Sequence, residues 1–160
     1  MKILKFGGTS VGSPEALGLA ARIITQELPR GGVVVVSALS GTTDRLLEAI
    51  AAASRGDVAR AMELHRSLVA RHQTVAEALG LTEGVTAAWA PLFERLAGLL
   101  EGMGLLWEAT PKAKDAALAV GETLSAHLLT ALLRSSALPA AFRDVRTVLQ
   151  TDGRHGRARP

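Results

Sequence analysis

The sequence predicts an α/β protein, because strand and helix signals alternate along its first 36 residues. Residues 1–4 predict a short strand, and the four consecutive valines at 33–36 are typical of a strand buried on both faces of a parallel sheet. A helix signal over about 14–28 separates the two strands. A strand, a crossover helix and a second strand make a βαβ unit, so we expect the strands to pair in parallel.

The first strand is linked to the first helix by the stretch KFGGTSVG at residues 5–12. The adjacent Gly7 and Gly8 let a ligand approach the main chain closely and leave backbone N–H groups free to point at it. Lys5 adds a positive charge at the end of the strand, so an anion is the natural ligand of this turn. The spacing matches neither the P-loop nor the G-x-G-x-x-G turn. Taken alone, two glycines fit an ordinary strand-to-helix turn equally well.

The first helix has clear start and stop signals. Ser13 is a good N-cap, Pro14 fits the first helical position, and Pro29 ends the pattern. The loop at 37–41 follows the valine strand in the same way as residues 5–8 follow the first strand. Ligands of parallel sheets bind beyond the carboxyl ends of the strands, so we expect the two loops to form one site.

A helical region rich in alanine and leucine extends from about residue 43 to residue 110. Asp57 is the predicted N-cap of a helix that stops at Gly80, and Thr82 is the predicted cap of the next helix. His65 and His72 lie seven residues apart and share a helix face. Because the chain has no cysteine and no matching acidic cluster, this pair does not indicate a metal site.

The last predicted helix opens at the N-cap Thr110 and runs to about residue 134. Gly121, Glu122 and Ser125 interrupt its apolar sequence, and Glu122 and Ser125 share one face. No cation stands three or four positions from Glu122, and burying its carboxylate without one would be costly. Either Glu122 is exposed on a solvent stripe, or its partner comes from elsewhere in the fold or from a ligand.

Composition limits the classes of function. With 160 residues, 48% hydrophobic and 21% charged, the chain fits one globular domain. It has no cysteine, which excludes disulfides and thiolate metal sites and suits a reducing cytoplasm. No uninterrupted apolar run approaches the roughly 18 residues of a membrane span, and no signal-peptide pattern opens the chain. We therefore expect a cytoplasmic protein that does not enter a membrane.

The C-terminal end combines a predicted strand at 138–143 with a basic segment. Between residues 143 and 160 lie five arginines and two aspartates, an excess that equals the net charge of +3 of the whole chain. Nucleic-acid-binding segments interleave such charge with aromatic residues or carry a recognition helix, and this segment has neither. We expect no nucleic-acid partner, and a basic segment that packs against further sequence.

Residues 5–11, KFGGTSV, resemble the N-terminal signature of the aspartate kinases in the amino-acid kinase family. Three further stretches support the resemblance in the same order: VVVVSALSGTTD at 33–44, GETLS at 121–125 and DVRTVLQTDGRHGRA at 144–158. The resemblance implies a three-layer α/β/α sandwich of the amino-acid kinase (carbamate kinase-like) type. It also implies that residues 1–160 are the N-terminal part of a truncated catalytic domain, without the C-terminal nucleotide-binding half and the ACT regulatory domains.

The same resemblance implies a reaction and its cofactors. The reaction is the ATP-dependent phosphorylation of the L-aspartate β-carboxylate to 4-phospho-L-aspartate, the first step towards lysine, threonine and methionine. That carboxylate, with an ordinary pKa of about 3.9, is already ionised at neutral pH, so no general base is required. Mg²⁺ would arrive with ATP rather than bind at a metal site of the protein.

The resemblance also assigns site residues. Lys5 would be catalytic, because it can neutralise charge on the transferred phosphoryl group. The ATP phosphates would be bound by Lys5, Phe6, Gly7 and Gly8. The substrate would be bound by Ser37 and Thr43 near its reacting end and by Glu122 at its ammonium group.

Two alternatives to an aspartate kinase remain open at this stage. The chain could be a noncatalytic fragment or degenerate relative that acts as an interaction module, or it could belong to another branch of the amino-acid kinases. As an aspartate kinase, the chain by itself is expected to be an incomplete enzyme. We expect it to form a homo-oligomer or to associate with the missing C-terminal half.

Overall fold

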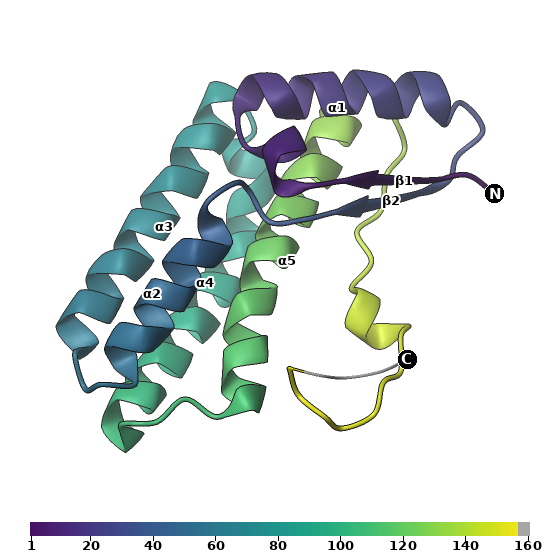
Figure 1. Ribbon diagram of the computed structural model, residues 1–160. Coiled ribbons are helices and arrows are strands. Elements are labelled where there is room, and N and C mark those ends of the chain that lie inside the picture. The colour runs from purple at the N-terminus through teal and green to yellow at the C-terminus, as the bar shows by residue number, and fades with distance from the viewer. Residues whose placement is uncertain (157–160) are drawn as a thin grey trace.

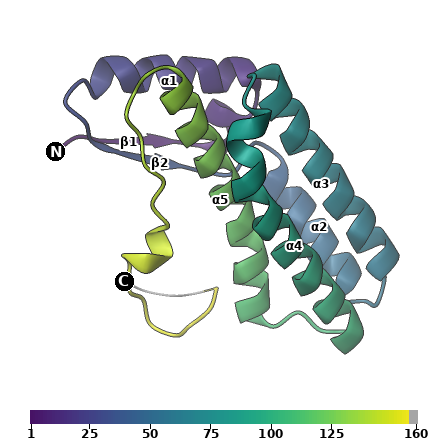
Figure 2. The ribbon, with the colours of Figure 1, turned by 180° about the vertical axis from the view of Figure 1, so that it is seen from behind.

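The structure is a computed structural model that describes residues 1–156; residues 157–160, the last part of the basic segment, lie outside the described residues. The elements follow in the order β1 Ile3–Phe6, η1 Gly8–Val11, α1 Pro14–Glu27, β2 Val33–Val36, α2 Thr42–Ala53, α3 Val58–Ala78, α4 Thr82–Leu106, α5 Pro111–Ser135 and η2 Val145–Thr147. Figure 1 and Figure 2 show α2, α3, α4 and α5 gathered into a bundle at one end of a small sheet, with α1 lying along the strands.

Three of the predicted helix starts are confirmed by local hydrogen bonds. The Ser13, Asp57 and Thr110 side chains accept from the backbone N–H three residues ahead, at 3.2, 3.0 and 3.2 Å. The predicted cap at Thr82 is wrong, because Thr82 is already the first residue of α4. The Leu81 N–H donates to the Ala76 carbonyl at 2.8 Å, so the end of α3 fixes the chain one residue before Thr82.

The two strands pair in parallel, as predicted, with Lys5 opposite Val35. The first strand starts at Ile3 instead of Met1, because the pairing begins where the Val33 N–H donates to the carbonyl of the preceding Lys2 at 3.1 Å. Along β1 and β2 the even-numbered residues pack toward the core. The odd-numbered apolar residues are exposed: Ile3 by 58%, Val33 by 41% and Val35 by 47%.

The prediction that the valine strand is buried on both faces is therefore wrong for the described part of the chain. Helices α1 and α5, which contact each other, cover the even-numbered face, and no element within residues 1–156 covers the odd-numbered face. Residues 1–156 thus build a helical layer and a sheet with one open face. Apolar side chains on that face remain in contact with water.

The predicted strand at 138–143 is wrong, because this segment is coil that runs back along α5. Pro139 has no N–H to donate to a ladder, and the Arg134 side chain already donates to the Ala140 carbonyl at 2.7 Å. The Phe142 ring instead stacks on His127 with centroids 4.0 Å apart. Further on, the Gly156 N–H donates to the Asp115 carboxylate at the start of α5, at 2.8 Å.

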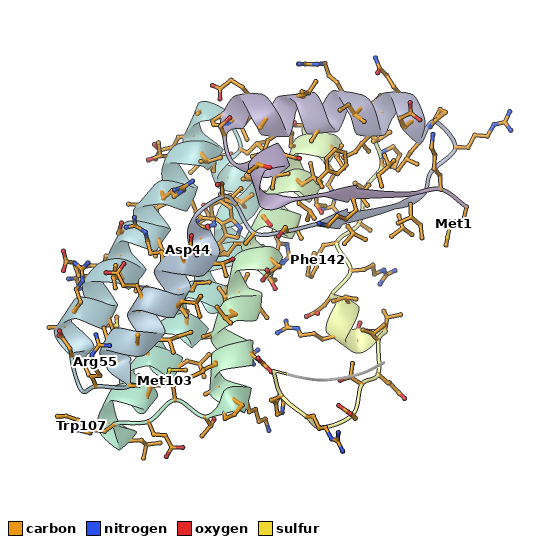
Figure 3. All side chains as sticks on the ribbon, viewed as in Figure 1. Met1, Asp44, Arg55, Met103, Trp107 and Phe142 are labelled. Atoms are coloured by element: carbon orange, nitrogen blue, oxygen red, sulfur yellow. The ribbon has the colours of Figure 1, made fainter. Side chains whose placement is uncertain are left out.

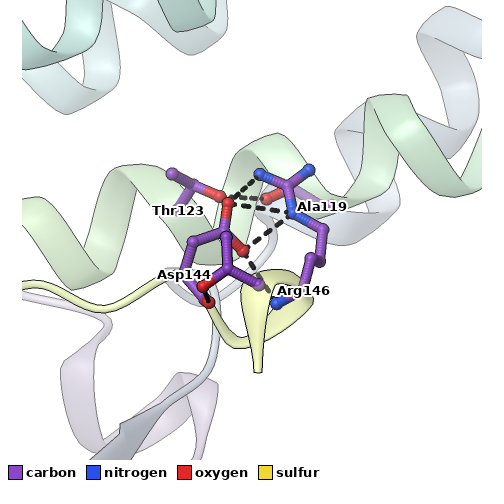
Figure 4. A network of polar contacts seen from close by, with 5 residues as sticks. Ala119, Thr123, Asp144 and Arg146 are labelled. Carbon is purple, nitrogen blue, oxygen red and sulfur yellow. Dashed lines mark hydrogen bonds and ion pairs between the residues drawn. The ribbon is translucent and has the colours of Figure 1, made fainter. Parts of the chain in front are cut away.

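An ion pair fixes the turn after this coil. Asp144 accepts from the Arg146 backbone N–H at 3.0 Å and pairs with its guanidinium (Figure 4). The Arg146 side chain lowers the pKa of Asp144. Both groups are partly exposed, so we assign the pair a local role in ordering η2.

The core lies mainly among the helices, and α5 is its central element. By length and composition α5 could cross a membrane, with a mean hydropathy of 1.5 over 18 residues. However, 56% of that window is buried inside the fold. Its buried residues pack against the other helices: Ala117, Val120, Leu124, Leu128, Leu129, Leu132 and Leu133.

His72 is a buried titratable side chain in this core. Its Nδ1 donates to the Leu68 carbonyl at 2.8 Å, and its ring packs edge-on against Trp89 and Phe93. Its Nε2 has no hydrogen-bond partner among the described residues. Burial is the main cause that lowers the pKa of His72 below its ordinary value of 6.5.

This burial predicts that acidification destabilises the chain. Below about pH 6.5 the unfolded chain protonates His72 while the native state resists, so stability is present above that pH and is lost below it. Urea unfolding measured between pH 7.5 and 5.5 should show a falling free energy of unfolding. His72→Leu should make the free energy of unfolding depend less steeply on pH. The remaining dependence should come in part from the half-buried His127, because burial lowers its pKa as well.

Leu64→Val is the control for lost packing, because Leu64 is buried in the same helix, α3, and has no titratable group; it should lower stability and leave the pH dependence unchanged. An identical slope in His72→Leu and the parent chain would contradict the assignment.

Candidate functional site

The loops that follow β1 and β2 lie against each other at the carboxyl ends of the strands, as the topology predicted. The Ser37 N–H donates to the Phe6 carbonyl at 3.0 Å, which extends the pairing by one residue. A Cβ placed on Gly8 would lie 3.0 Å from the Ala38 carbonyl oxygen, and one on Gly12 would lie 2.9 Å from the Ser40 Cβ. Gly8 and Gly12 are therefore needed for the close approach of the second loop.

Lys5 places its cation over the glycine turn. It is exposed and belongs to the open face of the sheet. Its Nζ lies 3.9 Å from the position that a Cβ on Gly7 would occupy, so the ammonium folds back over the main chain. Within residues 1–156 it has no ion pair, so its charge is available to an anion.

Phe6 differs from its neighbours in the predicted phosphate-binding set. Its side chain is 9% exposed and belongs to the core, and its carbonyl accepts from Ser37. The side chain is therefore a packing element beneath the turn, and Lys5, Gly7 and Gly8 carry the exposed surface.

The N-terminus of α2 follows directly on the loop after β2, so it lies near the carboxyl end of that strand. Gly41, at φ +75°, turns the chain into this helix, and Thr43 and Asp44 lie exposed in its first turn. Figure 3 shows Asp44 at the end of α2 next to the sheet, whereas Met103 and Trp107 lie at the opposite end of the bundle. A helix N-terminus carries partial positive charge and free N–H groups, which favour an anion beside Thr43.

The middle of α5 closes the site from the other side. A Cβ on Gly121 would lie 2.9 Å from the Thr42 Cγ2 and 3.1 Å from the Ala38 Cβ. The fully buried Ser125 donates its hydroxyl hydrogen to the Ser37 carbonyl at 2.6 Å, and the Glu122 carbonyl lies 3.1 Å from the same hydroxyl. The GETLS turn therefore holds the loop that carries Ser37.

The Glu122 carboxylate is exposed, so burial does not oblige it to find a cation. Within residues 1–156 it has no hydrogen bond or ion pair, although it lies in the turn that contacts the Ser37 loop. The structure thus brings Lys5, Gly7, Gly8 and Ser37 together with the turns that carry Thr43 and Glu122. The roles assigned to these residues stay predictions.

Sequence reasoning missed the Ser125–Ser37 hydrogen bond and the packing role of Gly12 and Gly121. Glycine and serine four residues apart on one helix face were the available signal, because they mark a face on which another backbone approaches closely. A groove of about 510 Å³ in the described part of the chain does not coincide with this site. It lies between α1, α5 and residues 138–141, away from the carboxyl ends of the strands.

We predict that Gly121→Ala destabilises the chain although alanine favours helix. The better helix propensity contributes about 1 kcal/mol, but overpacking typically costs about 1–3 kcal/mol, and both Thr42 and Ala38 offer rigid atoms. Urea unfolding should show a net decrease in the free energy of unfolding. Gly98→Ala is the control: no atom lies within 4 Å of its new Cβ, so it should stabilise by about 0.5–1 kcal/mol.

Adding Thr42→Ser to Gly121→Ala removes the closest methyl group and should recover part of the loss. Equal stability gains at positions 98 and 121 would contradict the close approach.

A glycine turn, a cation and a helix N-terminus lie together near the carboxyl ends of two parallel strands, an arrangement typical of α/β proteins that bind anions. A sequence model of the amino acid kinase family matches residues 1–159, and the chain belongs to this family. The predicted α/β fold class of amino-acid kinase type is thereby confirmed.

Similar proteins are aspartokinases. The aspartokinase of Chlamydia muridarum is 35% identical over 158 residues, which are 99% of this chain and 33% of that protein. The lysine-sensitive aspartokinase 3 of Escherichia coli K12 is 28% identical over 99% of this chain and 34% of that protein. The chain thus spans about a third of the length of these relatives.

Solved structures agree. The chain resembles E. coli aspartokinase III in complex with lysine and aspartate, with a TM-score of 0.86 and 29% identity over 99% of this chain and 34% of that one. It resembles the same enzyme in complex with aspartate and ADP with a TM-score of 0.82 and 28% identity, at the same coverage.

Proposed function

We propose that the protein to which this chain belongs is an aspartate kinase, which transfers the γ-phosphoryl group of ATP to the β-carboxylate of L-aspartate. The observation that carries this proposal is the convergence of the KFGGTSV turn, the SALSGTT loop and the GETLS turn on one surface. The similarity to two aspartokinase III structures, both with aspartate and one also with ADP, supports it.

The chemistry needs positioning and charge neutralisation more than proton transfer. A β-carboxylate oxygen attacks the γ-phosphorus, a new P–O bond forms, and the bond to the β-phosphate bridging oxygen breaks to release ADP. In the proposal, the Lys5 ammonium and the Gly7 and Gly8 N–H groups face the phosphoryl oxygens, where negative charge is concentrated.

The substrate would lie across the same surface. Ser37 and Thr43, beside the N-terminus of α2, would contact its reacting carboxylate, where the helix dipole favours negative charge. Glu122 would hold its ammonium group by a charge-assisted hydrogen bond. The site would therefore be positive towards the phosphoryl group and negative towards the amino group.

Nucleotide, metal and further protein belong to the same proposal. Mg²⁺ would be held mainly by the phosphates of ATP, because this cation keeps several of its waters and is rarely enclosed by protein ligands alone. Further protein, from a C-terminal half or an oligomer, would complete the nucleotide site. A cysteine-free chain suits a cytoplasmic location.

A substrate panel tests the proposal in the protein that carries the natural downstream sequence. Aspartate-dependent ADP release, absent with glutamate, acetylglutamate and carbamate, is the expected result. Turnover with one of the others would assign the chain to another branch of the family. No turnover with any of them would favour the noncatalytic interaction module.

Residues 1–160 alone should turn over little or no ATP with aspartate. The converging loops supply a phosphate cradle and part of a substrate pocket, and the open sheet face favours self-association through exposed apolar residues. ADP release by the purified chain, with its size measured by light scattering, checks this. Robust aspartate-dependent turnover by a monomer of this length would refute it.

Lys5→Ala, made in the protein with its downstream sequence, should mainly lower kcat. The charge that Lys5 meets grows during phosphoryl transfer, and loss of such a contact typically costs about 10²–10³ in rate. Lys5→Arg should restore only part of it, because a planar guanidinium replaces a compact ammonium.

Lys2→Ala is the matched control. Lys2 lies just before the start of β1, at the end of the strand away from the glycine turn, and its ammonium pairs with Glu27 at the end of α1. Steady-state kinetics should show a near-normal kcat for this control. A near-normal kcat in Lys5→Ala as well would remove Lys5 from the phosphate cradle.

Glu122→Gln should raise the aspartate KM by roughly tenfold or more, with little change in the ATP KM. The substitution keeps size but removes a charge-assisted contact worth about 1.5–3 kcal/mol, and about 1.4 kcal/mol corresponds to tenfold. The exposed Glu101→Gln on α4 is the control and should leave both KM values unchanged. If the aspartate KM of Glu122→Gln equals that of the control, Glu122 is a surface residue.

A further inference from the structure

One turn of α5, Gly121–Ser125, is held by contacts from two directions. From the strand side, Gly121 packs against the Ser37 loop and the start of α2, and Ser125 donates to the Ser37 carbonyl. From α4, the Trp89 indole N–H donates to the Leu124 carbonyl at 3.1 Å. This last bond crosses the core between positions 35 residues apart.

The bond between Trp89 and Leu124 is made in a dry environment. Trp89 is 3% exposed and Leu124 is fully buried. A carbonyl has two lone pairs, so an interior helix carbonyl can accept from a side chain in addition to its helical N–H. An indole N–H buried without an acceptor would be costly, which ties the orientation of Trp89 to the position of this turn.

Two aromatic rings hold the indole ring of Trp89 in place. The His72 ring meets it edge-on, with centroids 5.7 Å apart and planes at 89°, and Phe93 meets it at 6.1 Å and 73°. Trp89 therefore cannot follow a movement of α5 without disturbing α3 as well. Its fixed ring thereby restrains the backbone of the turn that carries Glu122.

The position of Glu122 depends on the rotation of α5 about its own axis. Side-chain tips lie about 5–6 Å from a helix axis, so a rotation of about 10° moves them by about 1 Å. Displacements of about 1 Å are large enough to change substrate binding and rate. Gly121 and Ser125 restrain this rotation on the strand side, and the Trp89–Leu124 bond restrains it from α4.

We propose that Trp89 is a positioning residue for the aspartate pocket: its indole N–H, bonded to the Leu124 carbonyl, sets the orientation of the turn that presents Glu122. Trp89 does not touch the substrate. This inference rests on the proposed function and adds a residue that is remote from the reacting atoms.

The test is Trp89→Phe in the protein with its natural downstream sequence. Phenylalanine keeps an aromatic ring against His72 and Phe93 but removes the N–H donor. Loss of one buried hydrogen bond should raise the aspartate KM about threefold to tenfold, while kcat and the ATP KM change less than about twofold.

Ile24→Val is the stability-matched control, because Ile24 is 1% exposed in α1 and lines a groove with Leu129 and Leu133, which come later in α5 than the Glu122 turn. It should lower the midpoint of urea unfolding and leave the aspartate KM unchanged. An aspartate KM of Trp89→Phe equal to the parent value, or raised equally in Ile24→Val, would overturn the positioning role.

The two hypotheses fail in distinguishable ways. A parent protein that turns over no aspartate refutes the proposed function and, with it, the positioning role. A parent protein that turns over aspartate, together with a normal aspartate KM in Trp89→Phe, refutes only the role of Trp89.

Discussion

The candidate site depends on the contact between α5 and the loop after β2. The buried Ser125 hydroxyl donates to the Ser37 carbonyl at 2.6 Å, across 88 positions of the sequence, and the missing side chain of Gly121 lets the backbones approach. Because Ser37 also pairs with Phe6, this contact fixes the second strand end and the glycine turn together. A larger side chain at position 121 would push the helix away from the Ser37 loop and the start of α2.

Charge is divided across this surface. The Lys5 ammonium lies over Gly7 without an acidic partner in residues 1–156, and the N-terminus of α2 adds partial positive charge beside Thr43. The Glu122 carboxylate lies in the turn that closes the other side. An amino acid that presents a carboxylate at one end and an ammonium at the other matches this polarity, which agrees with the proposed function.

The apolar residues of the chain are divided between a buried helical core and one exposed face of the sheet. The helices bury long aliphatic rows, and α5 contributes its apolar side to the centre of the bundle. The even-numbered strand residues join this core, whereas Ile3, Val33 and Val35 stay in water. A run of four valines is suited to burial on both faces, so its sequence fits a sheet that is covered on both faces, whereas residues 1–156 cover one.

The sequence by itself determined the features that depend on neighbours a few residues apart. The caps at Ser13, Asp57 and Thr110 are hydrogen bonds across three residues, and the order strand, glycine turn, helix, strand follows from local patterns. Only the tertiary structure decided what depends on distant partners. It made residues 138–143 a coil along α5, gave Ser125 its acceptor, and left Glu122 exposed. Periodicity shows that a residue lies on a given face of a helix, but not which backbone, 88 residues away, will meet that face.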